Sequence, residues 1–141
     1  MANYIRNIER FRQYLQEQGL YMEEYTRENG VVFRAEQKLD SGTTVTGVIG
    51  FYDDSEFVDL YVFDYVTINN PLKKELIYSL INDLNANYRF TKFYEEDNSV
   101  SLKAAMMFQE NFEPSLVITN FIMLLRSADE SYSKFMKVIW S

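Results

Sequence analysis

The chain has 141 residues, the length of one domain, and its 21 acidic and 14 basic side chains give a formal net charge of -7. A domain of this size buries about two-thirds of the surface that its unfolded chain exposes, so it can build a core without disulfides. The sequence contains neither cysteine nor histidine. This excludes thiolate and imidazole metal sites, cysteine nucleophiles and Ser-His-Asp catalysis.

Charge and hydropathy also limit the partners and the location. A net negative charge repels phosphate backbones and anionic lipids, so we expect no nucleic-acid partner and no membrane partner. The N-terminal stretch MANYIRNIERFRQYLQEQG carries charges throughout, unlike a signal peptide. The most apolar run, LVITNFIMLL, is half as long as the ~20 residues that span a bilayer. These features predict a soluble, cytoplasmic protein.

The first half of the chain reads as a helix followed by strands. Helical spacing from Tyr4 to Leu15, through Ile8 and Phe11, predicts a first helix that stops at Gly19. Strand compositions follow at residues 31–39, 43–52 and 57–68, and the turn compositions DSG and DDSE separate them. This pattern predicts an antiparallel meander. Residues 21–28 could add a shorter strand before it, closed by a turn at Asn29 and Gly30.

The second half reads as helix, hairpin and helix. Asn70 followed by Pro71 is typical of a helix start, and the apolar face of that helix is predicted to be Leu72, Leu76, Ile77, Leu80 and Leu84. Residues 88–96 and 99–108 predict a hairpin that turns at Asp97 and Asn98. After Pro114 helical spacing continues to the end, at Val117, Phe121, Leu124, Ala128, Tyr132, Phe135 and Ile139. Because Ser127 and Glu130 fit a capping box, this segment is either one long helix or a kinked pair.

The predicted order is therefore α-β-β-β-α-β-β-α. Strands that follow one another in sequence, with helices that can share one side, indicate an α+β fold in which an antiparallel sheet of about five strands is backed by helices. No low-complexity linker divides the chain, so residues 1–141 are predicted to form a single domain.

Few residues offer catalytic chemistry. Asp59 and Asp64 are five residues apart, so a regular strand places them on opposite faces and they cannot act as an acid and base couple; a bulge between them would restore a shared face. The turns YDDSE and YEEDNS lack the spacing of a calcium loop. Ser131 and Lys134 match a Ser-x-x-Lys pattern without its companion motifs. Gly47 and Gly50 do not make a phosphate loop, because no helix start or lysine follows them; glycines inside a strand more often mark a bulge or a close neighbour. We therefore predict no catalytic, cofactor-binding or metal-binding residues and no enzyme.

The strand at residues 57–68, FVDLYVFDYVTI, is apolar on both faces. Its even positions Val58, Leu60, Val62, Val66 and Ile68 suit the helices, with Asp64 as the one interruption. Its odd positions Phe57, Tyr61, Phe63 and Tyr65, with Asp59 among them, make an aromatic stripe, and its expected neighbours on adjacent strands are polar: Arg34, Glu36, Lys38, Thr44, Thr46 and Tyr52. An aromatic stripe in a polar sheet face is typical of a partner-binding surface. The alternative is that these rings are strand formers that cover one another.

The segment LINDLNANYRFTKFYEEDNSVSLKAAMMF resembles the YbjN-like family of proposed bacterial sensory transduction regulators. The residues that carry the resemblance are Leu80, Asn82, Leu84, Asn85, Phe90, Phe93, Asp97, Val100, Ser101 and Leu102. The resemblance implies a two-layer α+β domain with a fold like that of type III secretion chaperones. It also implies self-association, no established catalytic residues and no cofactor.

Together these features predict a non-enzymatic protein-interaction domain, either a regulator or a chaperone-like binder. We expect it to act through its apolar and aromatic surface, as a homodimer and with a protein client. The alternative is a small-molecule sensor with a pocket between helices and sheet, lined by Met106, Met107 and tyrosine side chains.

Overall fold

The computed structural model describes residues 2–108 and 111–141. The chain begins with helix α1, Ala2–Glu17, and continues through strands β1, Glu23–Arg27, β2, Gly30–Lys38, β3, Thr44–Tyr52, and β4, Phe57–Thr67. A short 3-10 turn, Pro71–Lys73, leads into α2, Lys74–Asn87; strands β5, Lys92–Glu96, and β6, Ser99–Met107, follow. Helix α3, Pro114–Trp140, ends the chain.

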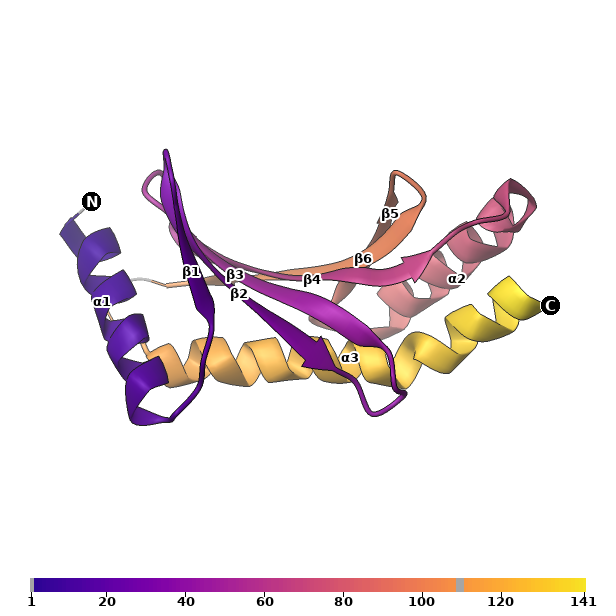
Figure 1. The fold of residues 1–141 in the computed structure, drawn as a ribbon. Coiled ribbons are helices and arrows are strands. Elements are labelled where there is room, and N and C mark those ends of the chain that lie inside the picture. The colour runs from indigo at the N-terminus through magenta and orange to yellow at the C-terminus, as the bar shows by residue number, and fades with distance from the viewer. Residues whose placement is uncertain (1, 109–110) are drawn as a thin grey trace.

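All of these strands join one antiparallel sheet in the order β1-β2-β3-β4-β6-β5 (Figure 1). The α+β prediction is confirmed, with six strands where the sequence predicted about five, because the short segment before Asn29 does pair with β2. The hairpin between β5 and β6 turns on Asp97 and Asn98, whose φ angles of 52° and 65° give the left-handed turn that two-residue hairpins prefer.

The three helices lie on one side of this sheet, as Figure 1 shows. Phe11 of α1 contacts Phe33 and Phe51, with ring centroids 5.0 and 5.3 Å apart. Phe121 of α3 packs on Gly47 of β3, where an added Cβ would lie only 2.2 Å from the ring. The prediction that this strand glycine marks a close neighbour is confirmed.

Helix α2 protects the outer edge of β5. The side-chain amide of Asn85 donates to the carbonyl of Phe93 over 3.0 Å and accepts from its N–H over 2.7 Å. Asn85 thus occupies the outward backbone groups of Phe93, which an edge strand would otherwise leave open to other chains. The buried residues of α2 include Ile77 and Leu84, whereas Leu76, predicted on the same face, is 52 % exposed.

The last helix is continuous from Pro114 to Trp140. Ser127, which the sequence allowed as the cap of a new segment, is buried inside this helix, where its hydroxyl donates to the carbonyl of Met123, 3.1 Å away. Such bonds to the preceding turn bend helices slightly, and α3 changes direction along its length in Figure 1.

Candidate binding face

Among residues 2–108 and 111–141, no helix covers the side of the sheet opposite α1, α2 and α3, and we call this side the open face. Strand alternation assigns its residues: Val58, Leu60 and Val62 of β4 are fully buried toward the helices, so Phe57, Asp59, Tyr61 and Phe63 point to the other side. Phe57 is 40 % exposed and the other three are half-buried. Figure 1 shows the sheet curving away from the helices at both ends, around this face.

An aromatic pair lies in the middle of the open face. The rings of Tyr61 and Phe63 are stacked, with centroids 5.0 Å apart and planes 12° apart. Their cross-strand partners on β3 are Val48 and Thr46, which are too short to cover them. On the other side Lys103 of β6 lies opposite Tyr61. The stripe predicted at Phe57, Tyr61 and Phe63 is therefore present, and no helix of the described chain lies over it.

The expectation that Tyr65 belongs to this stripe is wrong. Tyr65 is 3 % exposed, its hydroxyl donates to the carbonyl of Ala128 on α3 over 2.5 Å, and its ring meets that of Phe135 edge to face. Burial raises the pKa of the Tyr65 hydroxyl far above its usual value. Tyr65 is a core residue that connects β4 to α3.

A bulge in β4 explains this inversion. Val62 pairs with Leu102 and Val66 with Val100, so three residues of β4 face a single residue of β6. Asp64 sits in the bulge with a φ of 59°, in the left-handed region that aspartate tolerates better than most residues. Because the bulge adds two residues, Val66 stays on the helix side, where the sequence placed it.

The bulge also changes the position of the Asp64 carboxylate. It accepts a hydrogen bond of 2.9 Å from the hydroxyl of Thr46, a residue whose cross-strand partner, Phe63, lies on the open face. The prediction that Asp59 and Asp64 lie on opposite faces is therefore wrong. They still form no acid and base couple, because the four residue-to-residue steps from Asp59 to Phe63 span about 13 Å along a strand.

The partial burial of the open face shifts the pKa values of two of its side chains, Asp59 and Tyr61. Desolvation raises the pKa of the Asp59 carboxyl, and the charge of Lys103 opposes that shift. Desolvation also raises the pKa of the Tyr61 hydroxyl, with a further contribution from Asp59. Both groups are thus in a partly water-excluded environment on a face that no helix covers.

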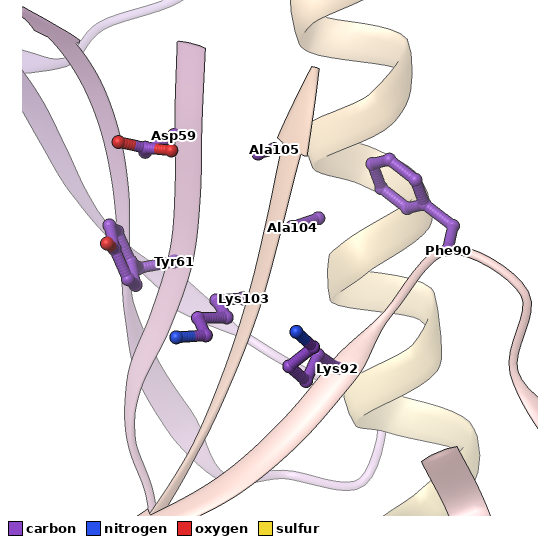
Figure 2. Close-up of a pocket in the computed structure, with 7 residues that line it drawn as sticks. All are labelled: Asp59, Tyr61, Phe90, Lys92, Lys103, Ala104 and Ala105. Carbon is purple, nitrogen blue, oxygen red and sulfur yellow. The ribbon is translucent and has the colours of Figure 1, made fainter. Parts of the chain in front are cut away.

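A hollow of about 310 Å³ opens at one end of this face, beside β6 (Figure 2). Asp59 and Tyr61 of β4 line one side of it, Lys92 and Phe90 line the other, and Ala105 and Lys103 of β6 lie between them. Neither lysine was predicted from the sequence to line a site. The hairpin turn was the available signal, because a two-residue turn at Asp97 and Asn98 places Lys92 opposite Lys103.

Other residues named from the sequence do not come together. Ser131 is buried and donates to the hydroxyl of Tyr88 over 3.3 Å, whereas Lys134 is exposed. Met106 pairs with Val58 and Met107 with Phe57, so the two methionines point to opposite faces and do not line one pocket. Across residues 2–108 and 111–141, no cluster of acidic side chains is arranged to hold a metal ion.

Hydropathy gives one further observation. In the described part of the chain, no helix combines the length and the apolar character needed to cross a membrane.

The fold, with its six strands and helices on one side, can be compared with known structures. The crystal structure of YbjN from E. coli, a proposed transcription regulator, superimposes with a TM-score of 0.61 over 90 % of this chain and 92 % of that one. The chain has a YbjN-like fold. Sequence identity to YbjN is 13 %, so the likeness is one of fold. No protein-family model and no curated protein matches the sequence.

Proposed function

We propose that this YbjN-like domain is a non-catalytic protein-interaction domain, a regulator or chaperone-like binder that self-associates as a homodimer through its open face. The observation that carries the proposal is the stacked pair of Tyr61 and Phe63, half-exposed on a sheet face without helices. Aromatic side chains supply much of the energy of protein interfaces. The proposed regulatory role of E. coli YbjN agrees with a binding function.

The charge of the chain favours a protein partner. A formal charge of -7 opposes binding to a nucleic-acid backbone. The open face itself mixes apolar rings with both signs of charge, including Asp59, Arg34 and Lys103. Such a mixture suits a second protein surface, because charges around an apolar centre set the orientation of the partner.

Light scattering coupled to size exclusion tests this function. We expect the wild-type chain at tens of micromolar to have twice the mass of one chain, and Tyr61→Asp to shift it toward the monomer. The variant should keep its circular dichroism spectrum, because the new carboxylate would face Lys103, its cross-strand neighbour.

Tyr21→Asp is the matched control. Tyr21 is 82 % exposed and precedes β1, away from the stacked pair, so this change adds the same charge without touching the open face. A wild-type chain that is monomeric at these concentrations, or a Tyr61→Asp variant that stays dimeric, contradicts the proposed dimer.

A further inference from the structure

Strand β6 is longer than its outer neighbour, which leaves part of its edge unpaired. β5 pairs with residues 99–103 of β6, while β6 continues to Met107. The N–H of Phe108 donates to the carbonyl of Glu56 over 3.0 Å. Since hydrogen-bonding direction alternates along an antiparallel strand, Ala104 and Met106 bond toward β4, and the backbone groups of Ala105 and Met107 point outward.

Nothing in the described chain pairs with this outward edge. The ladder between β5 and β6 ends at Lys92 and Lys103, and before it the hydroxyl of Thr91 is bonded to that of Ser127 on α3, 2.7 Å away. By contrast, Asn85 bonds both outward backbone groups of Phe93 in β5. The fold therefore protects one edge and leaves the adjoining one, from Ala104 to Met107, free to accept another strand.

Two lysines stand where that free edge begins. Lys92 and Lys103 are directly opposite each other on the open face, and like charges in this position are destabilising. Among residues 2–108 and 111–141 no carboxylate lies within 4 Å of either lysine, although Asp59 is close enough for the charge of Lys103 to oppose the rise in its pKa. Lys103 instead lies over the ring of Tyr94, 4.9 Å from its centroid. Figure 2 shows both lysine side chains lining the hollow beside β6.

From these two features we infer that the β6 edge binds the extended C-terminal end of a partner protein as an added antiparallel strand, with its terminal carboxylate held by Lys92 and Lys103. A strand antiparallel to β6 is collinear with β5 and runs toward Lys92, so its last residue arrives at the lysine pair. The free edge of four residues, about 13 Å long, sets the length of the bound segment. The inference rests on the proposed protein-binding function and names the chemistry of one partner.

The hollow gives room for the bound side chains. A peptide residue opposite Ala105 would point to the open face, because paired residues share a face. There the small Ala105 leaves the space between Tyr61 and Phe90 that forms the 310 Å³ hollow. Backbone pairing would supply affinity regardless of sequence, and the carboxylate would fix the register through charge-assisted hydrogen bonds.

Synthetic peptides test this inference. The probe is acetyl-Val-Thr-Val-Thr-Val with a free C-terminal carboxylate, compared with the same peptide ending in an amide, and binding is followed by amide chemical shifts. We expect the free acid to shift the Ala105 and Met107 amides and to bind at least about tenfold more tightly than the amide, the effect of one lost charge-assisted hydrogen bond.

Two variants separate the two parts of the site. Replacing both lysines, Lys92→Met with Lys103→Met, should reduce the affinity of the free acid to that of the amide, whereas Lys134→Met on α3 should not. Ala105→Pro should abolish binding of both peptides and keep the fold, because the N–H that it removes points away from β4. If Ala105→Pro does not fold, the comparison of the double lysine variant with Lys134→Met still tests the inference.

Several outcomes overturn the inference. These are equal binding of acid and amide, no shifts at millimolar peptide, or the same shifts with sodium acetate alone, which would indicate a simple anion site. None of them bears on self-association, which Tyr61→Asp reports separately by light scattering. Failure at the β6 edge is therefore distinguishable from failure of the proposed dimer.

Discussion

Asp64 lies in the bulge that sets which aromatic side chains the open face presents. Its left-handed backbone and its bond to Thr46 accompany the bulge that turns Tyr65 inward, while Phe63 stays outside. Two tyrosines of one strand, Tyr61 and Tyr65, therefore have opposite roles, although both occupy odd positions. Substitution of each by phenylalanine separates these roles, because it removes only a hydroxyl.

We predict that Tyr65→Phe lowers the free energy of unfolding by about 1 kcal/mol, because a buried hydrogen bond to the carbonyl of Ala128 is lost. Tyr61→Phe should change it by less than about 0.5 kcal/mol, as expected for a half-exposed side chain. Urea denaturation of both variants measures the difference. An equal loss of unfolding free energy in Tyr65→Phe and Tyr61→Phe would show that the Tyr65 hydroxyl is not buried against α3.

The bulge could not be predicted from β4 alone. The sequence FVDLYVFDYVTI alternates well enough to be read as one regular strand, and the even positions Val58, Leu60, Val62 and Val66 are indeed buried. The two extra residues become visible only against β6, whose Val100 and Leu102 pair with Val66 and Val62. The pairing of β4 with β6, rather than the local sequence of β4, therefore determines that the Tyr65 side chain is buried.

At the scale of elements, the close contact between α3 and the sheet depends on a glycine, Gly47, which has no side chain. Gly47 of β3 lies against the ring of Phe121, and Gly50 lies under the ring of Tyr52 on the open face, with an added Cβ 2.7 Å from its hydroxyl. Phe121 is held between helix and sheet at 8 % exposure, whereas Tyr52 is half-exposed and can move aside. The same substitution should therefore have different costs at the two glycines.

Gly47→Ala is expected to destabilise the fold by about 1 to 3 kcal/mol, the usual cost of overpacking a core. Gly50→Ala should be near neutral, because displacement of Tyr52 is offset by the smaller entropy of the unfolded chain. Thermal unfolding of the two variants provides the comparison. A Gly47→Ala variant as stable as Gly50→Ala would mean that α3 does not pack closely on β3.

Element order and the helix-facing residues followed from the sequence, since amphipathic spacing and turn residues are local signals. Ile8, Phe11 and Leu15 of α1 are buried as predicted, and so are Val117, Phe121 and Leu124 of α3. The hollow beside β6 did not follow, because it depends on where β5 begins, at Lys92. Strand ends are set by competing contacts, here the turn of the chain at Thr91 and Phe90 toward α3.

At the scale of the whole molecule, one core connects every helix with the sheet. Phe11 of α1, Ile77 of α2 and Phe135 of α3 are each fully buried in the same cluster of apolar residues. The sheet likewise runs without interruption from β1 to β5. Since no element has a separate core, the described chain should unfold as one cooperative unit.

Differential scanning calorimetry measures this cooperativity. We predict a single transition whose enthalpy is about 100 kcal/mol near 60 °C, from about 0.7 kcal/mol per residue over 141 residues. For the proposed homodimer the midpoint temperature should rise with protein concentration, because association stabilises the folded state by mass action, and Tyr61→Asp should abolish that rise. Two separate transitions would contradict a single domain, whereas a midpoint independent of concentration would contradict the dimer alone.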